Sequence, residues 1–387
     1  MPPLNNKEIN AIFKEKLFYL GEEFNLSLLS GFVKTLYQIP IEYATQALSL
    51  AKTQQDVNKK PIKLNYSIKY LINEPFNAGT CNRDGASFIF INSSVPYLLF
   101  KACISYAELC DIKKSTIKEK KLKLLATKKI KLTQKLDYSL ANPESIERLF
   151  QKLLKDSAHI NKLVFQYALF LYEIAIRFLT MHECMHVILG HTGYVKQKFN
   201  LDDYLEFSEE REHKIPLSTS QALEFMADRN TCRGILVQTL QGNSIYNVYS
   251  SKLKSSKLSR EMLISRSVTN ALSIILHIFP GKLIENMSET LIKTHPHPFI
   301  RMQWMITEMS YEVGDENSFN HYFLKPFALN IATFKDNFEI KYPWTLLSDK
   351  DLKEGSYRNL FSYTSYKKII ITSKQVQKET QPFKLIY

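Results

Sequence analysis

The sequence has little glycine and proline, with 11 Gly and 14 Pro among 387 residues. This scarcity favours helices with short connections over a sandwich with many turns. The five cysteines are odd in number and form no CxxC pair, so we expect no disulfide framework and a reducing compartment. The N-terminus lacks a basic segment followed by an apolar run, which argues against a signal peptide. No stretch resembles a membrane span, because the most apolar one, 164–181, contains Glu173 and Arg177. These absences predict a cytoplasmic protein without integral membrane segments.

Apolar residues are plentiful enough for a real core. Hydrophobic residues make up 45% of the chain and aromatic residues 12%. Apolar spacings of three and four predict a mainly helical α+β fold. We expect Pro40 to separate two helices within 6–57. A long helix that is apolar nearly all round, ending before Gly190, should be the buried centre of the domain. Helices are predicted over 6–57, 96–112, 142–157, 161–189, 218–241 and 258–279, with a further helix emerging from a loop after Thr294.

Two segments have the patterns of strands. Residues 62–72 alternate between apolar and polar side chains, and 86–92 is rich in Phe and Ile. A turn at Arg83-Asp84-Gly85 precedes the second segment. We expect the two to form a small antiparallel sheet against the central helix. Residues 192–215 are polar and predict a solvated loop or lid, and Lys367–Thr372 resembles a strand.

The net charge is +13, and much of it lies in one segment. Residues 113–135 hold ten lysines and one glutamate, with no arginine and no aromatic residue. Such a run is typical of a solvated hairpin or insertion. It could also bind an anionic partner such as nucleic acid, an acidic protein or a membrane surface. Without aromatic side chains it is not expected to stack on bases.

The most informative motif is HExxH at 182–186. His182 and His186 are four residues apart, so on a helix both imidazoles can bind one zinc ion. Glu183 lies next to the first ligand and could hold a water beside the metal. Cys184, inside the motif, is expected to be a small core residue on the other face of the helix.

A catalytic zinc needs a third protein ligand and one open position. The best candidate is Glu224, and Asp228 follows it at the spacing of one helical turn. Glu224 can ligate the metal, while Asp228 can accept the outer N–H of a ligand histidine, most simply His182. An ordinary exposed acidic pair is the alternative. His191 is expected to be a packed or capping residue, because its spacing does not fit a third histidine ligand.

HECMHVILGH followed by EFMAD resembles the gluzincins, which share HExxH and ExxxD. It is most similar to the branch of the CAAX prenyl-protein proteases and the bacterial heat-shock membrane protease. That branch also has an Asn-Ala pair before a Gly turn and a short apolar strand, and a Thr-His-Pro followed by an arginine. The corresponding residues here are Asn77-Ala78, Gly85, Phe88–Ile91, Thr294-His295-Pro296 and Arg301.

The resemblance implies a zincin-like metallopeptidase fold and a set of roles. Glu183 would be the general base, and His295 would donate to the oxyanion, with His297 as an alternative donor. Arg301 would orient that histidine or grip substrate. The segment Phe88, Ile89, Phe90, Ile91 and Asn92 would be an edge strand onto which a peptide adds.

The resemblance also implies a domain plan. Residues 1–61 would be an N-terminal helical segment, 62–312 a gluzincin-like domain with 113–135 as an insertion, and 313–387 a C-terminal extension. Unlike the best-known members of that branch, this chain has no predicted membrane helix. Solubility, size and motif give a looser similarity to the phage-exclusion peptidases of the Lit type.

These observations predict a soluble zinc endopeptidase with one Zn2+ per chain and a narrow intracellular protein target, as in defence or toxin systems. Two alternatives stay open. One is a zinc-stabilised binding protein without catalytic activity, whose basic insertion contacts nucleic acid or an acidic protein. Retention of Glu183 argues against it, since a structural site needs no base. The other is a zinc hydrolase that acts on a non-peptide amide.

Overall fold

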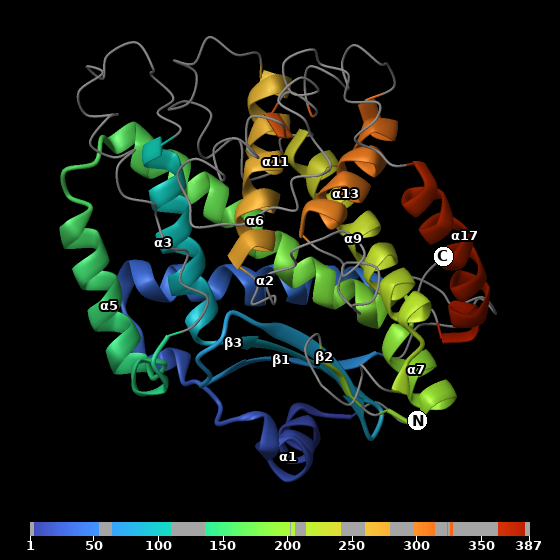
Figure 1. Cartoon of the computed structure of the whole chain (residues 1–387). Helices are drawn as coiled ribbons and strands as arrows, with labels where there is room; N and C mark the ends of the chain where they lie inside the picture. Colours follow the sequence, from blue (N-terminus) through green and yellow to red (C-terminus); the bar gives the residue numbers. More distant parts are fainter. Residues whose placement is uncertain are drawn as a thin grey trace.

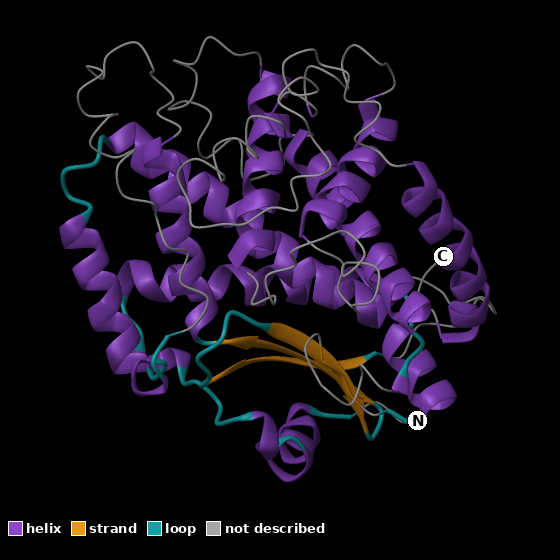
Figure 2. Ribbon diagram, in the orientation of Figure 1, coloured by secondary structure: helices purple, strands orange, loops and turns teal. Residues whose placement is uncertain are grey.

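The structure is a computed structural model of the whole chain. It describes residues 4–53, 64–109, 136–201, 203–205, 214–240, 260–278, 298–313, 323, 326–327 and 363–383. The described part is mainly helical with one small sheet, an α+β fold (Figures 1 and 2). Its strands are β1 (Asn65–Leu71), β2 (Ala78–Arg83), β3 (Ala86–Asn92) and β4 (Asp203–Leu205). Its α-helices are α1 (Asn6–Lys16), α2 (Gly31–Thr53), α3 (Ser94–Leu109), α5 (Pro143–Asp156), α6 (Lys162–Ile188), α7 (His191–Phe199), α9 (Leu217–Leu240), α11 (Arg260–Ile278), α13 (Pro298–Val313) and α17 (Tyr363–Thr380).

The sheet lies between α1 on one face and the large group of helices on the other (Figure 1). Phe88 and Phe90 pack with Phe13 of α1, whereas Ile89 packs with Cys184 of α6 on the opposite face. Side chains alternate between the faces of a strand, so β3 is apolar throughout because both of its faces are covered. All seven residues of β3 are buried.

The sheet is mixed, so the predicted antiparallel sheet is wrong in one pairing. Its order is β1-β3-β2-β4, with β1 parallel to β3 and the other two pairs antiparallel. The strand β2 was not predicted, because its residues do not alternate between apolar and polar side chains. Asp84 and Gly85 both have positive φ, 47° and 81°, and form the two-residue turn of a β2–β3 hairpin. The strand β2 runs opposite to β1, and β3 runs opposite to β2. For this reason β3 is parallel to β1.

The central helix is α6, as predicted, and it crosses the middle of the molecule in Figure 1. It begins after Asn161, whose side chain accepts a hydrogen bond from the Leu163 amide. It packs against α2, α3, α9 and α11 and against the sheet. Among the described residues it is the one helix long and apolar enough to cross a membrane, and 67% of its apolar window is buried inside the protein.

The helix α2 is continuous through Pro40, so the predicted break there is wrong. A proline inside a helix leaves the carbonyl four residues earlier without its usual donor. Here that carbonyl belongs to Leu36, and the hydroxyl of Tyr172 on α6 donates to it at 2.9 Å. The contact replaces the missing bond and also joins α2 to the central helix.

Two other predictions about local structure are wrong. Residues 191–199 form α7 rather than the start of a loop, and 367–372 belong to α17 rather than to a strand. In α17 the buried residues recur at helical spacing against α9, and this packing outweighs the strand preference of the isoleucine run. These buried residues are Ile369, Ser373, Val376 and Thr380.

One large core is shared by helices from all three predicted segments. Its members extend from Phe24 in the N-terminal segment to Val376 in the C-terminal one. Each fully buried large apolar side chain contributes about 1.5–3 kcal/mol, so α2 and α17 are tied to the same core as α6. The division at 61/62 and 312/313 stays a prediction. The basic segment 113–135 lies outside the described residues.

Candidate metal centre

Two histidines project from the last turns of α6. His182 and His186 are separated by one helical turn and are 1% and 0% exposed. Their ring centroids are 4.7 Å apart, and the two Nε2 atoms are 3.1 Å apart. The helix spacing therefore aims both Nε2 atoms at the same point, as the sequence predicted.

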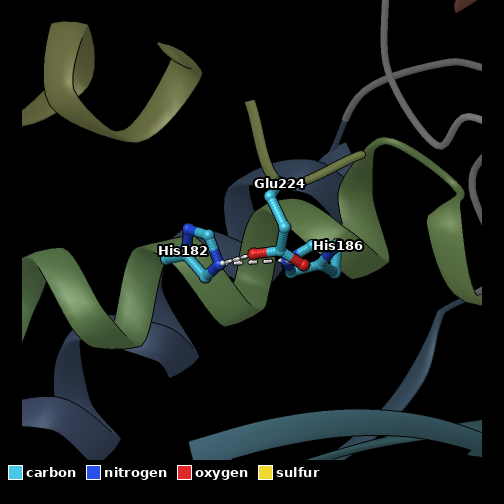
Figure 3. Close-up of side chains that lie close together, drawn as sticks. All are labelled: His182, His186 and Glu224. Atoms are coloured by element: carbon cyan, nitrogen blue, oxygen red, sulfur yellow. Dashed lines mark hydrogen bonds and ion pairs between the residues drawn. The ribbon is translucent and has the colours of Figure 1, made fainter. Parts of the chain in front are cut away.

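The third group comes from α9, which packs along α6. Figure 3 shows Glu224 reaching from its own helix to the two rings. Its Oε2 is 3.2 Å from His182 Nε2, and its Oε1 is 3.8 Å from His186 Nε2. Glu224 is completely buried. One donor atom from each of His182, His186 and Glu224 lies within 4.8 Å of the others, so the cluster could hold a metal ion.

The spacing of these donor atoms fits zinc. A tetrahedral ion with bonds of about 2.0–2.1 Å holds neighbouring donors roughly 3.3 Å apart. The two Nε2 atoms are 3.1 Å apart, and the two Glu224 oxygens lie 3.2 Å from His182 Nε2 (Oε2) and 3.8 Å from His186 Nε2 (Oε1). Two imidazoles and one carboxylate are ligands that zinc takes in catalytic sites. The donor set thus fits the predicted ion, and it does not by itself identify the metal.

The charges around the cluster also favour a divalent cation. Glu183, Glu224 and Asp228 are each at most 1% exposed, and Arg301 is 4% exposed. With the three carboxylates ionised, these four side chains hold two more negative charges than positive ones. Buried charge is costly unless it is balanced. A divalent ion between Glu224 and the two histidines would remove the excess.

Asp228 contacts Nδ1 of His182, the ring nitrogen that faces away from the candidate metal site. Its Oδ1 is 3.0 Å from His182 Nδ1, the contact expected from the sequence. Arg301 donates to both oxygens of Asp228, from Nε and Nη2, each at 2.8 Å. Burial would raise the pKa of Asp228, but the charge and hydrogen bonds of Arg301 and the bond from His182 outweigh it, and the pKa lies below its usual value. Asp228 is therefore a carboxylate that fixes the His182 ring.

His191 contacts the nitrogen of His186 that faces away from the candidate metal site, and the sequence did not predict this contact. Its Nδ1 is 2.9 Å from His186 Nδ1, and His191 is completely buried. It is the first residue of α7. Its five-residue spacing from His186 argues against a ligand role and gives no signal for a residue that contacts a candidate ligand from outside.

Two neighbouring residues of the motif face different surroundings. Glu183 is completely buried on α6 beside His182. Cys184 packs with Ile89, Val187 and Ile188 beneath the sheet. Burial, and then the charge of Glu183, raises the pKa of the Cys184 thiol. Cys184 is accordingly a neutral core residue, as expected.

The segment Phe88–Asn92 is not an edge strand, so its predicted role in substrate binding is wrong. It belongs to β3, which pairs with β1 on one side and β2 on the other. Both rows of backbone hydrogen-bonding groups are occupied, and a peptide cannot add to an interior strand. Its neighbour β2 contacts both α6 and α7.

The predicted oxyanion donors His295 and His297 lie outside the described residues. Arg301 is described, at the start of α13, and its guanidinium binds Asp228. Arg301 therefore fixes the Asp228 carboxylate, which in turn contacts the His182 ring.

Comparison with known proteins adds no family. No protein-family model matches the chain, and no significant match was found among curated proteins or solved structures. The gluzincin resemblance therefore stays a prediction that depends on the residues of the site.

Proposed function

We propose that this protein is a zinc-dependent endopeptidase whose metal is held by His182, His186 and Glu224. The observation that carries the proposal is the buried convergence of these donors from two helices, with Glu183 next to the first ligand. The outer contact from Asp228 to His182 adds the support that zinc-bound histidines usually have.

A bound zinc ion would supply Lewis acidity, which acidifies a water and polarises a carbonyl. We assign to the Glu183 carboxylate, which neighbours His182 in the sequence, the role of taking the proton of that water. The same carboxyl group can then pass the proton to the nitrogen of the leaving amine. Asp228 and Arg301 keep the His182 ring in place throughout, because their contacts do not involve the metal face of the ring.

The number and kind of ligands favour a catalytic site over a structural one. Structural zinc sites usually have four protein ligands, often cysteines, whereas catalytic sites keep one position for water. Among the described residues, the metal cluster consists of two histidines and one glutamate. A buried glutamate in the position of Glu183 has a function in hydrolysis and none in a structural site.

The strand β2 contacts the HExxH helix, and the Asn77-Ala78 pair of the gluzincin resemblance lies at its start. It pairs with β3 on one side and with β4 at Gly79, Thr80 and Cys81 on the other. An extended peptide could therefore pair with these three residues only by replacing β4.

The test compares the wild type with Glu183→Gln. The substitution keeps the size of the side chain and removes the base, so we expect full zinc content and no cleavage. Zinc is measured in the purified proteins by mass spectrometry. New protein N-termini are then identified in cells that express each form. The proposal predicts new N-termini with the wild type only.

Glu224→Ala is the matched control, since it removes a ligand and should lose both zinc and cleavage. Zinc bound at one ion per chain together with identical N-termini for the wild type and Glu183→Gln would overturn the proposed peptidase activity.

A further inference from the structure

We propose that His191 is a positioning residue for the zinc ligand His186 and sets which of its nitrogens is free to bind metal. The inference depends on the zinc site of the proposed function, and goes beyond it by giving the second histidine ligand its own outer partner. The observation is the 2.9 Å contact between the Nδ1 atoms of the two rings.

The geometry separates the two sides of the His186 ring. Its Nε2 faces His182 Nε2 at 3.1 Å and Glu224 Oε1 at 3.8 Å. Its Nδ1 faces His191. The two nitrogens of an imidazole point in widely different directions, so His191 lies behind the ligand and outside the donor cluster. This position rules out His191 as a third ligand through Nδ1.

The short contact determines the tautomers. A metal takes the lone pair of His186 Nε2, which puts the proton of the neutral ring on Nδ1. That Nδ1–H can donate only if His191 Nδ1 accepts, and neutral His191 then carries its own proton on Nε2. The two rings are nearly crossed, with an angle of 66° between their planes. Both rings are completely buried, so this contact is shielded from bulk solvent.

The backbone changes direction at Gly190, and this change places His191 beside His186. Gly190 has φ of 75° and lies between α6, which ends at Ile188, and α7, which begins at His191. The backbone of α7 is anchored there by the Tyr194 amide, which donates to the Gly190 carbonyl at 3.0 Å. His191 thus has a fixed backbone position one turn beyond His186.

The two ligands have different outer partners. His182 donates to a carboxylate held by Arg301, whereas His186 meets a neutral imidazole. A carboxylate raises the basicity of a ligand more than a neutral ring does. A neutral partner orients His186 without adding another negative charge to a buried site that already has three carboxylates.

The experiment replaces His191 with Leu and with Asn in the full-length protein. Leu keeps apolar volume and removes the acceptor, while the Asn side-chain oxygen can occupy the position of Nδ1 and accept. Zinc affinity is measured by competition with a chromophoric chelator. We expect His191→Leu to weaken zinc binding about 10–100-fold and His191→Asn to recover part of the loss. His277→Leu, which replaces a histidine that bonds the Ser273 carbonyl, is the control and should bind zinc as the wild type does.

A second measurement reports the hydrogen bond itself. Zinc-loaded proteins labelled with 15N in histidine are compared by NMR. We expect the Nδ1–H proton of His186 to exchange slowly with water in the wild type and in His191→Asn, and faster in His191→Leu. Unchanged zinc affinity and unchanged exchange of this proton in His191→Leu would overturn the inference while leaving the zinc site intact. Failure of the wild type to bind zinc would instead overturn the proposed function, and the inference with it.

Discussion

Two successive contacts at the residue scale fix the orientation of His182. Its Nδ1 meets Asp228 at 3.0 Å, and Arg301 donates twice to the same carboxylate. A charged acceptor makes a stronger hydrogen bond than a neutral one. The metal affinity of His182 should therefore depend on the charge of Asp228 as well as on its shape.

Asp228→Asn tests this dependence. The amide keeps the shape but removes the charge, so we expect zinc affinity to fall about 10–100-fold. Chelator competition measures it, with Glu308→Gln as the matched control. Glu308 is another buried carboxylate, paired with Arg229 at 2.8 Å, and its variant should keep the wild-type zinc affinity. Equal zinc affinity of Asp228→Asn and the wild type would contradict the role of Asp228.

Asp228→Ala should be worse for the fold than Asp228→Asn. Both variants remove the carboxylate, but Asn keeps one oxygen that can accept from Arg301, whereas Ala keeps none. Breaking a buried pair completely costs about 3–5 kcal/mol. Urea unfolding of the zinc-free proteins measures the difference. The same loss of stability in both variants would mean that the charge of Asp228, and not its shape, supports Arg301.

The members of the candidate metal site could be predicted from the sequence, because a spacing of four places side chains on one face of a helix whatever the rest of the fold does. That rule places His182 with His186 and Glu224 with Asp228. It says nothing of how α13 lies against α9 or how α7 follows α6, so the contacts of Arg301 with Asp228 and of His191 with His186 could not be predicted. Both depend on segments that are distant in sequence or separated by a turn.

At the scale of elements, the junction of α6 and α7 depends on Gly190. Besides its left-handed φ, a Cβ at this position would lie 2.3 Å from the backbone carbon and oxygen of Phe383. Phe383 ends the short helix Gln381–Phe383 that follows α17. The C-terminal segment also contacts α7 through Glu379, which accepts from the Tyr194 hydroxyl at 2.8 Å and pairs with Lys198.

Gly190→Ala should therefore destabilise the protein by more than the about 1–2 kcal/mol of the left-handed backbone alone. The clash is with backbone, so Phe383→Ala should not relieve it. Gly193→Ala is the matched comparison, since its Cβ would meet only the Phe383 side chain, at 3.1 Å. We expect that variant to be nearly neutral, because the Phe383 side chain can move aside. Urea unfolding of the single and double variants distinguishes the two cases, and rescue of Gly190→Ala by Phe383→Ala would contradict the backbone contact.

The helix α6 was predictable from its long apolar run, and α9 from the helix start at 218–221. Three errors share a different cause, which is that tertiary contacts override a local preference. The Tyr172 hydroxyl on α6 replaces the hydrogen bond that α2 lacks at Pro40. Packing of α17 against α9 favours a helix over a strand in its isoleucine run. The strand β2 lacks alternation and is defined by its partners on either side.

For the whole molecule, a metal ion would join the two helices that supply its ligands. Both α6 and α9 belong to the large core, so binding should stabilise the entire domain. At a free zinc concentration 100 times the dissociation constant, the gain is about 2.7 kcal/mol. We expect thermal unfolding at higher temperature with zinc and at lower temperature after treatment with a chelator.

The control for this shift is Glu224→Ala, which lacks one ligand. Its unfolding temperature should respond much less to zinc than that of the wild type. An equal response of the two proteins would mean that zinc acts at another place on the chain.

X-ray absorption at the zinc edge tests the central claim most directly, since it reports the atoms around the ion. For zinc-loaded protein at one ion per chain, we predict four light-atom ligands that include two imidazoles and no sulfur, with the imidazole signal reduced in His186→Ala. Bound sulfur, an imidazole count unchanged in His186→Ala, or no bound zinc would contradict a catalytic centre built from His182, His186 and Glu224.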